Sequence, residues 1–317
     1  MVRIMADSTT ASSDGSGLVI ISGASRGIGR AIALAIADAA CRANRDNNSS
    51  VSKLIAPRLH MVLISRSASS LQDTASMIKQ RCDNDGLDTI TTTCHEKMDL
   101  ADIDILPQNV AKILQPLSSS NENYHSCLLI NNAGSLGPLG KVTDICNDDS
   151  ASASLKRWKE TIDFNITSSM WISSQFAKAT SHVPLVRIVN ISSLCAIDPF
   201  PTMSLYCAGK AARDMFHAVL AKEQKIKADD EEETDQSQSL SNSVQFKVLN
   251  YAPGACDTEM TDTLADCADL DSELHTFFNT SRDEKKLIRP EDTAAKLVGL
   301  LGKDEFESGS HVDYWDI

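Results

Sequence analysis

The sequence has no long uninterrupted apolar run. No segment approaches the roughly 18 apolar residues that a membrane-spanning helix requires. The opening stretch, MVRIMADSTTASSDGSG, contains no apolar run of signal-peptide length either. We therefore expect a protein that does not enter a membrane and that works in the cytoplasm.

The chain has fewer basic than acidic residues. The 317-residue chain has 30 Lys and Arg against 43 Asp and Glu, so its formal net charge is -13. Proteins that neutralise a phosphate backbone or an anionic lipid surface carry the opposite balance. This composition argues against a function in binding nucleic acid or membranes.

The cysteine and histidine patterns of metal sites are also absent. The 9 cysteines are scattered and form no CxxC pair, and the 7 histidines form no ligand-spaced pair. Such scattered thiols are typical of reduced cysteines in a cytosolic protein. Zinc sites and Cys/His catalytic pairs are not indicated, so the sequence predicts no metal.

The alternation of apolar and helical segments predicts the fold. Short, nearly all-apolar segments are separated by segments with helical spacing, which is typical of a parallel sheet covered on both faces. We predict an α/β fold, with a single-domain Rossmann-type doubly wound parallel sheet and helices on both faces, over residues 17–317. The expected strands lie at 18–22, 60–65, 90–93, 126–130, 185–191 and 246–251, and the first expected helix at 27–40.

Three segments do not follow this alternation. Residues 1–16 are rich in Ser, Thr and Asp and predict a flexible tail. Residues 41–57 form a polar connection that predicts a surface insertion. Residues 223–243 include the acidic run DDEEETD, and repulsion between like charges with little apolar content predicts a disordered loop.

A glycine-rich turn follows the first expected strand. The sequence SGASRGIGR places Gly23, Gly27 and Gly29 between a strand and a helix. Glycines at such a turn let the backbone approach a pyrophosphate, and the helix N-terminus offers unpaired N–H groups to it. This context predicts a dinucleotide-binding site.

The end of the second expected strand indicates which dinucleotide. Enzymes that use NAD usually have an acid there, which accepts from the ribose 2′-OH. This chain instead has Ser65 and Arg66. Arg66, together with Arg26 in the glycine turn, can hold a 2′-phosphate through charge-assisted hydrogen bonds. The predicted cofactor is NADPH/NADP+.

A second group of residues points to catalysis. The sequence YCAGK spaces Tyr206 and Lys210 four apart, on one face of a helix. Ser193 stands upstream at the end of an expected strand, INNAG closes another strand, and Asn165 lies in the helix that follows. Because an open parallel sheet binds its ligands at the carboxyl ends of the strands, these side chains are candidates for one site.

These residues, in this order and spacing, resemble the short-chain dehydrogenase/reductase family over residues 17–317. Within it, the chain is most similar to enzymes that reduce the side-chain ketones of pterins. The stretches that carry this similarity are INNAGSLG, SSLCAIDPF, YCAGKAARDM, YAPGACDTEM and KDEFESGSHVDYWD.

The resemblance implies a role for each catalytic candidate. Tyr206 is the expected proton donor, and positive charge from Lys210 and the oxidised cofactor is expected to lower its pKa. Ser193 is expected to stabilise charge on the substrate oxygen. Lys210 also holds the cofactor ribose, and Asn165 anchors a water relay that reprotonates Tyr206.

The resemblance also implies two sets of binding residues. The cofactor-binding set is Gly23, Ala24, Ser25, Arg26, Gly27, Ile28, Gly29, Ser65, Arg66, Asp99, Leu100, Asn132, Ala133, Gly134, Tyr206, Lys210, Cys256, Asp257, Thr258 and Met260. The substrate-binding set is Ser193, Cys195, Tyr206, Gly254, Met260 and Asp313.

Two features of the substrate side stay open. A carboxylate that accepts two N–H groups suits a pterin edge, and Asp313 is favoured over Asp316 as this anchor. Met203 stands where the resemblance leads us to expect tryptophan, and an adaptable methionine can loosen specificity.

The resemblance implies a homodimer as well. The residues Trp158, Ile162, Ile166 and Met170 form a stripe with i, i+4 spacing, and the helix that carries Tyr206 has its own apolar face. Members of the family dimerise through these two helices.

The leading hypothesis is NADPH-dependent reduction of the side-chain ketones of pterins. The first alternative is a broad-specificity NADPH-dependent carbonyl or diketone reductase. A second alternative, from another class, is a protein of this fold that binds NADPH as a sensor or scaffold without catalysis.

Overall fold

The computed structural model describes residues 15–45, 56, 58–84, 89–118, 123–146, 150–234 and 244–317. Within these residues, one seven-stranded sheet has the order β3-β2-β1-β4-β5-β6-β7, and every neighbouring pair is parallel. The strands are β1 (Ser16–Ser22), β2 (Arg58–Ile64), β3 (Ile90–His95), β4 (Tyr124–Asn131), β5 (Leu185–Ile191), β6 (Gln245–Ala252) and β7 (His311–Asp313).

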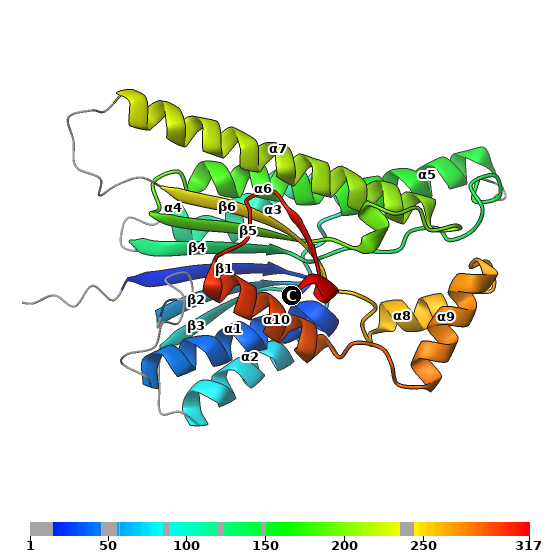
Figure 1. Ribbon diagram of the computed structural model, residues 1–317, viewed down its shortest axis with the longest axis horizontal. Coiled ribbons are helices and arrows are strands. Elements are labelled where there is room, and N and C mark those ends of the chain that lie inside the picture. The colour runs from blue at the N-terminus through cyan, green and yellow to red at the C-terminus, as the bar shows by residue number, and fades with distance from the viewer. Residues whose placement is uncertain are drawn as a thin grey trace, which may run out of the picture.

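Helices cover both faces of this sheet, as Figure 1 shows. One face carries α1 (Gly27–Arg45), α2 (Ala68–Asn84) and α10 (Pro290–Lys303). The other carries α3 (Leu106–Ile113), α4 (Gln115–Ser118), α5 (Ala151–Ile162), α6 (Ser168–Ala179) and α7 (Ser204–Thr234). Two further helices, α8 (Glu259–Ala265) and α9 (Ser272–Asp283), lie beyond the carboxyl ends of the strands. The predicted doubly wound α/β fold is confirmed.

Alternation along the buried strands builds two cores. In β1, Val19 and Ile21 belong to the cluster with α1, α2 and α10, whereas Leu18 and Ile20 belong to the cluster with α3 and α6. Successive side chains of a strand point to opposite faces, so a strand covered on both sides is apolar throughout. The strand order reverses between β1 and β4, which places a ligand-binding crevice beside the carboxyl end of β1.

The structure corrects the predicted element boundaries in two places. Helix α7 continues to Thr234, so the 223–234 part of the predicted disordered loop is helical. Helix α1 continues to Arg45, so residues 41–45 are not part of the polar connection. Residues 1–14, 46–55, 57 and 235–243, which hold the rest of the predicted tail and insertions, lie outside the described residues.

The edge strand β7 was not predicted. It has only three residues, which are half-buried and form no apolar run. It pairs with β6 through Asn250, Tyr251 and Ala252, and the His311 Nδ1 atom lies 2.7 Å from the Asp214 Oδ2 atom of α7. This contact ties the last strand directly to the long helix α7.

The His311 contact makes the stability of the fold depend on pH. The hydrogen bond with Asp214 raises the pKa of His311 against the opposing effect of burial, and Asp313 and Asp316 add to the increase. Because the pKa is higher in the folded chain, the contribution to stability is fully present below pH ~6.5, the unfolded value. It is lost as the pH rises through the folded value.

We therefore expect His311→Gln to lower the free energy of unfolding by about 1–2 kcal/mol at pH 6 and by much less at pH 9. Urea titrations of the variant and the wild type at both pH values measure this difference. The exposed His182, changed to Gln, is the matched control. An equal loss at the two pH values would contradict the assignment.

Candidate active site

The three central catalytic candidates meet at the carboxyl end of β5. Ser193 follows this strand directly, in extended backbone, and its Oγ accepts from the Cys195 N–H at 3.2 Å. Tyr206 lies in the first turn of α7 and is buried, and Ser193 is close enough to its hydroxyl to act on the pKa of Tyr206. The structure thus brings the predicted serine and tyrosine close together.

Lys210 lies one turn further along α7. It is buried, its Nζ donates to the Ile191 carbonyl at 2.7 Å, and this nitrogen is 5.5 Å from the centre of the Tyr206 ring. The bond to the last residue of β5 holds the lysine against the strand that carries Ser193. Ser193, Tyr206 and Lys210 therefore form one contiguous group.

The electrostatics of Tyr206 and Lys210 are dominated by burial. Burial raises the pKa of Tyr206, and the effect of Ser193 only partly opposes this. Burial also lowers the pKa of Lys210 well below its ordinary value, with a further decrease from Arg213. In the chain alone, desolvation disfavours both charged forms. The expected lowering of the tyrosine pKa by Lys210 together with the oxidised cofactor stays a prediction. A neutral phenol is nevertheless the form that donates a proton.

Asn165 takes a position that helical spacing alone does not predict. It lies in a π-helical turn, η1 (Asp163–Thr167), between α5 and α6. Its Oδ1 accepts from the Ser135 N–H and its Nδ2 donates to the Ser135 carbonyl, each at 2.8 Å. Such turns are frequent at functional sites. Here the turn aims the amide at the loop after β4, and its role in a water relay stays a prediction.

The glycine turn has the shape that a pyrophosphate requires. Gly23 and Gly27 have φ values of +70° and +52°, which favour glycine. A Cβ on Gly29 would lie 2.2 Å from the Gly23 carbonyl oxygen, and one on Gly27 would lie 3.4 Å from Thr258 Cγ2. The turn leads straight into the N-terminus of α1. These residues fit a nucleotide phosphate group.

Side chains outside the motif hold this turn in place. Arg30 donates to the Ser25 carbonyl and to Thr74 Oγ1, and Thr74 Oγ1 donates to the Ala24 carbonyl at 3.1 Å. From the other side, Asn132 Nδ2 donates to the Ser22 and Gly23 carbonyls at 3.1 and 3.2 Å. Arg30 and Thr74 were not predicted, since they are 44 positions apart and no local pattern joins them.

The residues at the end of β2 lie beside a cleft. Ser65 Oγ donates to Ser25 Oγ at 2.8 Å, and the exposed Arg66 guanidinium lies 5.6 Å from the centre of the Phe164 ring. A cleft of about 630 Å³ begins at Arg66 and Asp99 and continues past Phe164. The other predicted arginine, Arg26, is exposed and forms an ion pair with Glu259 at the start of α8.

The remaining predicted cofactor residues lie on the same edge. Ala24 lies in the turn before α1 and Ile28 in the first turn of that helix. Asp99 and Leu100 follow β3, Ala133 and Gly134 follow β4, and Asp257 precedes α8. Cys256 is buried, with its Sγ 3.4 Å from the Pro253 carbonyl, and Thr258 begins α8. The structure therefore gathers segments from four strands around one crevice.

An apolar cluster adjoins the catalytic group. Its buried members are Leu136, Cys195, Met203, Tyr206, Leu264, Ala265, Leu270 and Phe278, and Met260 packs against it. The Met260 Sδ lies 4.0 Å from the Tyr206 hydroxyl oxygen. Helices α8 and α9 supply Leu264, Ala265 and Phe278, so they form an apolar wall beside the tyrosine. Met203 is 2% exposed and packs as a core residue.

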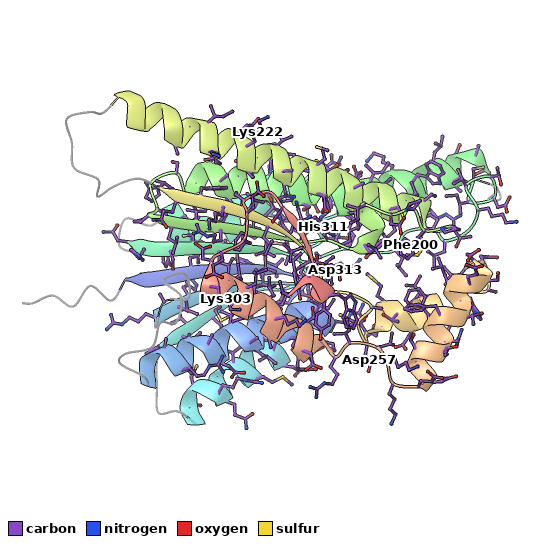
Figure 2. All side chains as sticks on the ribbon, viewed as in Figure 1. Phe200, Lys222, Asp257, Lys303, His311 and Asp313 are labelled. Carbon is purple, nitrogen blue, oxygen red and sulfur yellow. The ribbon has the colours of Figure 1, made fainter. Side chains whose placement is uncertain are left out.

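The two candidate anchors at the C-terminus have different environments. Asp313 is half-buried and its Oδ1 accepts from the Trp315 N–H at 3.0 Å, whereas Asp316 is exposed and accepts from the Asp313 N–H at 2.9 Å. Figure 2 shows His311 and Asp313 in succession along β7, with Asp313 nearer to Asp257. A Cβ on Gly254, whose φ is +75°, would lie 3.6 Å from Tyr314 Cβ, so the turn after β7 borders the loop before α8.

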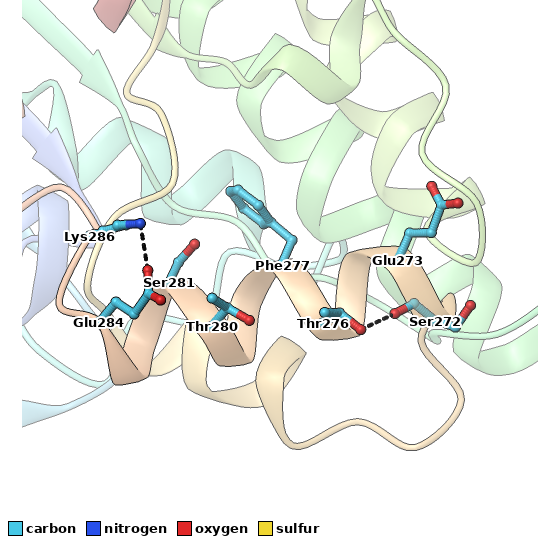
Figure 3. A pocket seen from close by; sticks show the side chains of 8 residues that line it. All are labelled: Ser272, Glu273, Thr276, Phe277, Thr280, Ser281, Glu284 and Lys286. Atoms are coloured by element: carbon cyan, nitrogen blue, oxygen red, sulfur yellow. Dashed lines mark hydrogen bonds and ion pairs between the residues drawn. The ribbon is translucent and has the colours of Figure 1, made fainter.

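A second hollow, of about 670 Å³, lies along one flank of α9 (Figure 3). Phe277, 51% exposed, projects into it, and Glu284 and Lys286 form an ion pair at one end. Among the described residues, none of the catalytic candidates lines this hollow. The reaction site at Ser193 and Tyr206 stays a prediction, and this hollow lies apart from it.

A row of polar side chains that the sequence analysis did not predict lies beneath the site. Asn131 of β4, Asn190 of β5, Asn250 of β6 and His311 of β7 occupy matching positions on adjacent strands. The row could have been predicted from the sequence, because an asparagine stands near the end of each of three expected strands, in the stretches LINN, IVNI and VLNY. Asn190 Nδ2 donates to Asn250 Oδ1 at 2.9 Å and to Asp214 Oδ1 at 2.8 Å. The row therefore continues into α7.

Arg213 completes this network. It is 1% exposed, and its guanidinium donates to Asn190 Oδ1 at 2.7 Å and to the Ala133 and Asn131 carbonyls at 3.0 and 2.6 Å. Burial lowers the pKa of this arginine to about 10. It lies three residues after Lys210, and its contacts come from strand ends far away in the sequence.

In the part of the chain that the structure describes, no group of three or more His, Cys, Asp or Glu side chains is placed to hold a metal ion. The same residues include no helix with the length and hydropathy needed to traverse a bilayer.

Comparison with known proteins gives a consistent result. The short chain dehydrogenase family matches residues 17–228. Sepiapterin reductase of Rattus norvegicus is 32% identical over 306 residues, which cover 96% of this chain and 98% of the relative. Benzil reductase ((S)-benzoin forming) of Bacillus cereus is 27% identical over 213 residues, covering 67% of this chain and 76% of the relative. The crystal structure of the KRED1-Pglu enzyme has the same fold, with a TM-score of 0.66 and 19% identity over 93% of this chain and 100% of that one.

Proposed function

Since the chain belongs to the short-chain dehydrogenase family of oxidoreductases, we propose that it is a sepiapterin reductase that uses NADPH. Its proposed reactions are the reduction of sepiapterin to dihydrobiopterin and of 6-pyruvoyl-tetrahydropterin to tetrahydrobiopterin. The observation that carries this proposal is the similarity to the rat enzyme over 96% of this chain. This similarity includes the C-terminal segment beyond the general family match, which ends at residue 228.

The proposed chemistry assigns one task to each side chain. When bound, reduced nicotinamide supplies a hydride for the ketone carbon. Tyr206, kept protonated by burial, donates a proton to the ketone oxygen, and Ser193 hydrogen-bonds that oxygen as negative charge develops on it. Lys210, held by the Ile191 carbonyl, is proposed to bind the nicotinamide ribose. Asn165 holds the loop after β4 through Ser135.

The preference for NADPH rests on the end of β2. Arg66 is exposed and lines the 630 Å³ cleft together with Asp99. A guanidinium there can bind a 2′-phosphate with two parallel hydrogen bonds. Arg26 can reach the same group from the glycine turn once its ion pair with Glu259 opens.

The pterin site rests on Asp313. This carboxylate lies at the carboxyl edge of β7, is half-buried, and keeps its position through the cap on Trp315. A planar guanidine-like edge offers two N–H donors that suit one carboxylate. Cys195, Gly254 and Met260 are proposed to line the remainder of the pocket.

A second candidate function is the reduction of diketones. The similarity to the Bacillus benzil reductase favours it, and the buried Met203 leaves no aromatic platform at that position. The ratio of kcat/KM for sepiapterin to that for a small diketone discriminates between the two functions.

We also propose that the protein forms a homodimer in the cytoplasm. Leu155 and Ile162 on α5, Trp171 on α6, and Met215 and Val219 on α7 are large apolar side chains that are exposed in the single chain. A second copy that packs on these helices would bury them. None of the 9 cysteines forms a disulfide bond, which suits a reducing compartment.

The acid role of Tyr206 predicts a specific loss. We expect Tyr206→Phe to lower kcat by about 10²- to 10⁴-fold, because the phenol proton is removed while the ring still fills its site. The Kd for NADPH, measured by fluorescence titration, should change little. Turnover close to that of the wild type would overturn the mechanism.

The role of Arg66 predicts a change in cofactor preference. We expect Arg66→Ala to weaken NADPH binding by about 10- to 100-fold, since a charge-assisted pair is lost, and to leave NADH binding nearly unchanged. Arg58→Ala, at the opposite end of β2, is the matched control. Equal losses for both cofactors would disprove the assignment.

The role of Asp313 is tested with a variant that preserves the cap. Asp313→Asn retains an oxygen acceptor for the Trp315 N–H but removes the charge. We expect its KM for sepiapterin to rise by about tenfold or more while KM for a small diketone stays within about twofold. Asp316→Asn is the control and should change neither value. If Asp316→Asn gives the selective effect instead, Asp316 is the anchor.

A further inference from the structure

Helices α8 and α9 form a unit that leaves the body of the protein and returns to it at one place (Figure 1). The unit spans residues 258–287, and at its base the Asp257 N–H donates to the Ile288 carbonyl at 2.8 Å. The two helices are joined to each other, since Asn279 Nδ2 of α9 donates to the Ala265 carbonyl of α8 at 2.9 Å. A contact away from this base therefore helps to fix how the unit lies against the reaction site.

The start of α9 is attached to the loop between β5 and α7. The Asp271 N–H, at the cap of α9, donates to Thr202 Oγ1 at 2.9 Å. The Thr202 carbonyl also accepts from the Gly140 N–H, in the segment between β4 and α5, at 2.9 Å. Thr202 thus joins three segments that are far apart in the sequence, and its own loop connects Ser193 to Tyr206.

Thr202 has an unusual backbone conformation. Its φ is +65°, in the left-handed region that glycine adopts freely and that is strained for a β-branched residue. Such a conformation costs free energy and persists only where the surrounding structure holds it, and residues of this kind concentrate at active sites and ligand clamps. The hydrogen bonds of Thr202 to Gly140 and Asp271 supply that support.

The residues next to this contact belong to the apolar wall beside the tyrosine. Met203 follows Thr202 and Leu270 precedes Asp271, and both Met203 and Leu270 are buried in the cluster that contains Tyr206. The hydrogen bond between Thr202 and Asp271 therefore joins the two sides of this wall at adjacent positions. The distance between α9 and Tyr206 consequently depends on this bond.

We propose that Thr202 is a specificity-determining residue, whose hydroxyl holds α9 against the loop before α7 and so fixes the apolar wall beside Tyr206 for a large carbonyl substrate. It acts through α9 and Met203, so it is a positioning residue and not a catalytic one. A bicyclic pterin fills more of the space beside this wall than a small diketone does, and contacts remote from the reacting carbon supply the energy that positions a substrate. This inference rests on the proposed function, because it concerns the choice between those two substrates.

Hydrogen exchange of the full chain tests the attachment without reference to activity. Thr202→Val retains the shape and the β-branch but removes the acceptor for the Asp271 N–H. We expect the amides in the first turn of α9 to exchange about 3- to 10-fold faster than in the wild type, measured by mass spectrometry, because the loss of one hydrogen bond lets the turn open more often. Thr202→Ser keeps the hydroxyl and should restore wild-type exchange.

Two further variants make this measurement decisive. Thr202→Gly removes the hydroxyl together with the strain, so it should fold even if Thr202→Val does not, and it should show the same faster exchange. Thr263→Val removes an exposed hydroxyl of α8 that donates to the Glu259 carbonyl at 2.8 Å inside that helix, and it should exchange as the wild type does. Unchanged exchange in the glycine variant would overturn the proposal.

The second measurement compares two substrates. In Thr202→Gly we expect KM for sepiapterin to rise about 5- to 10-fold while KM for a small diketone stays within about twofold, because only the larger substrate needs the wall in place. Thr202→Ser should keep both values. General damage to the fold would instead reduce turnover of both substrates by the same factor, and that result would refute the proposal.

The two measurements separate this inference from the proposed function. If the wild type reduces sepiapterin and the ratio of the two KM values is unchanged in Thr202→Gly, the inference fails and the proposed function stands. If the wild type does not reduce sepiapterin, the proposed function fails, while faster exchange of the α9 amides in Thr202→Gly still supports the attachment of α9 through Thr202.

Discussion

The reaction site depends on how helix α7 packs on the sheet. Its first turns carry Tyr206 and Lys210, and the next turn buries Arg213 against the asparagine row of β4, β5 and β6. A buried guanidinium without acceptors is strongly destabilising, so the helix must lie where Asn190 and the strand-end carbonyls can accept. Asp214 adds a second attachment, through Asn190 and His311. These bonds fix the position of α7 on the sheet, and therefore the position of Tyr206 relative to Ser193.

The carboxyl edge of the parallel sheet brings the remaining parts together. Parallel strands end on one side, so the segments after β1, β2, β4, β5 and β6 all face the same crevice. The close approach of Gly29 to the Gly23 carbonyl shapes the first of these segments, and Asn132 links it to the segment after β4. The cofactor side and the catalytic side are therefore parts of one rigid edge, joined by hydrogen bonds between backbone and side chains.

Burial at this edge acts on each titratable group in the direction that its charge dictates. The same apolar surroundings raise the pKa of Tyr206 and lower that of Lys210, because both lose hydration of their charged forms.

Local sequence pattern determined the class of this protein. The apolar strands, the glycine turn and the Ser193, Tyr206 and Lys210 spacing each depend on residues close together in the chain, so the α/β fold and the catalytic group could be predicted from them. Only the tertiary structure decided the rest. The strand β7 has three residues and exists through its pairing with β6, and the Arg213 network joins residues up to 82 positions apart. The helical continuation of α7 through residues 223–234 and the direction of the Tyr206 pKa in the chain alone also escaped prediction. The latter depends on desolvation, a property of the packed surroundings that no spacing of residues records.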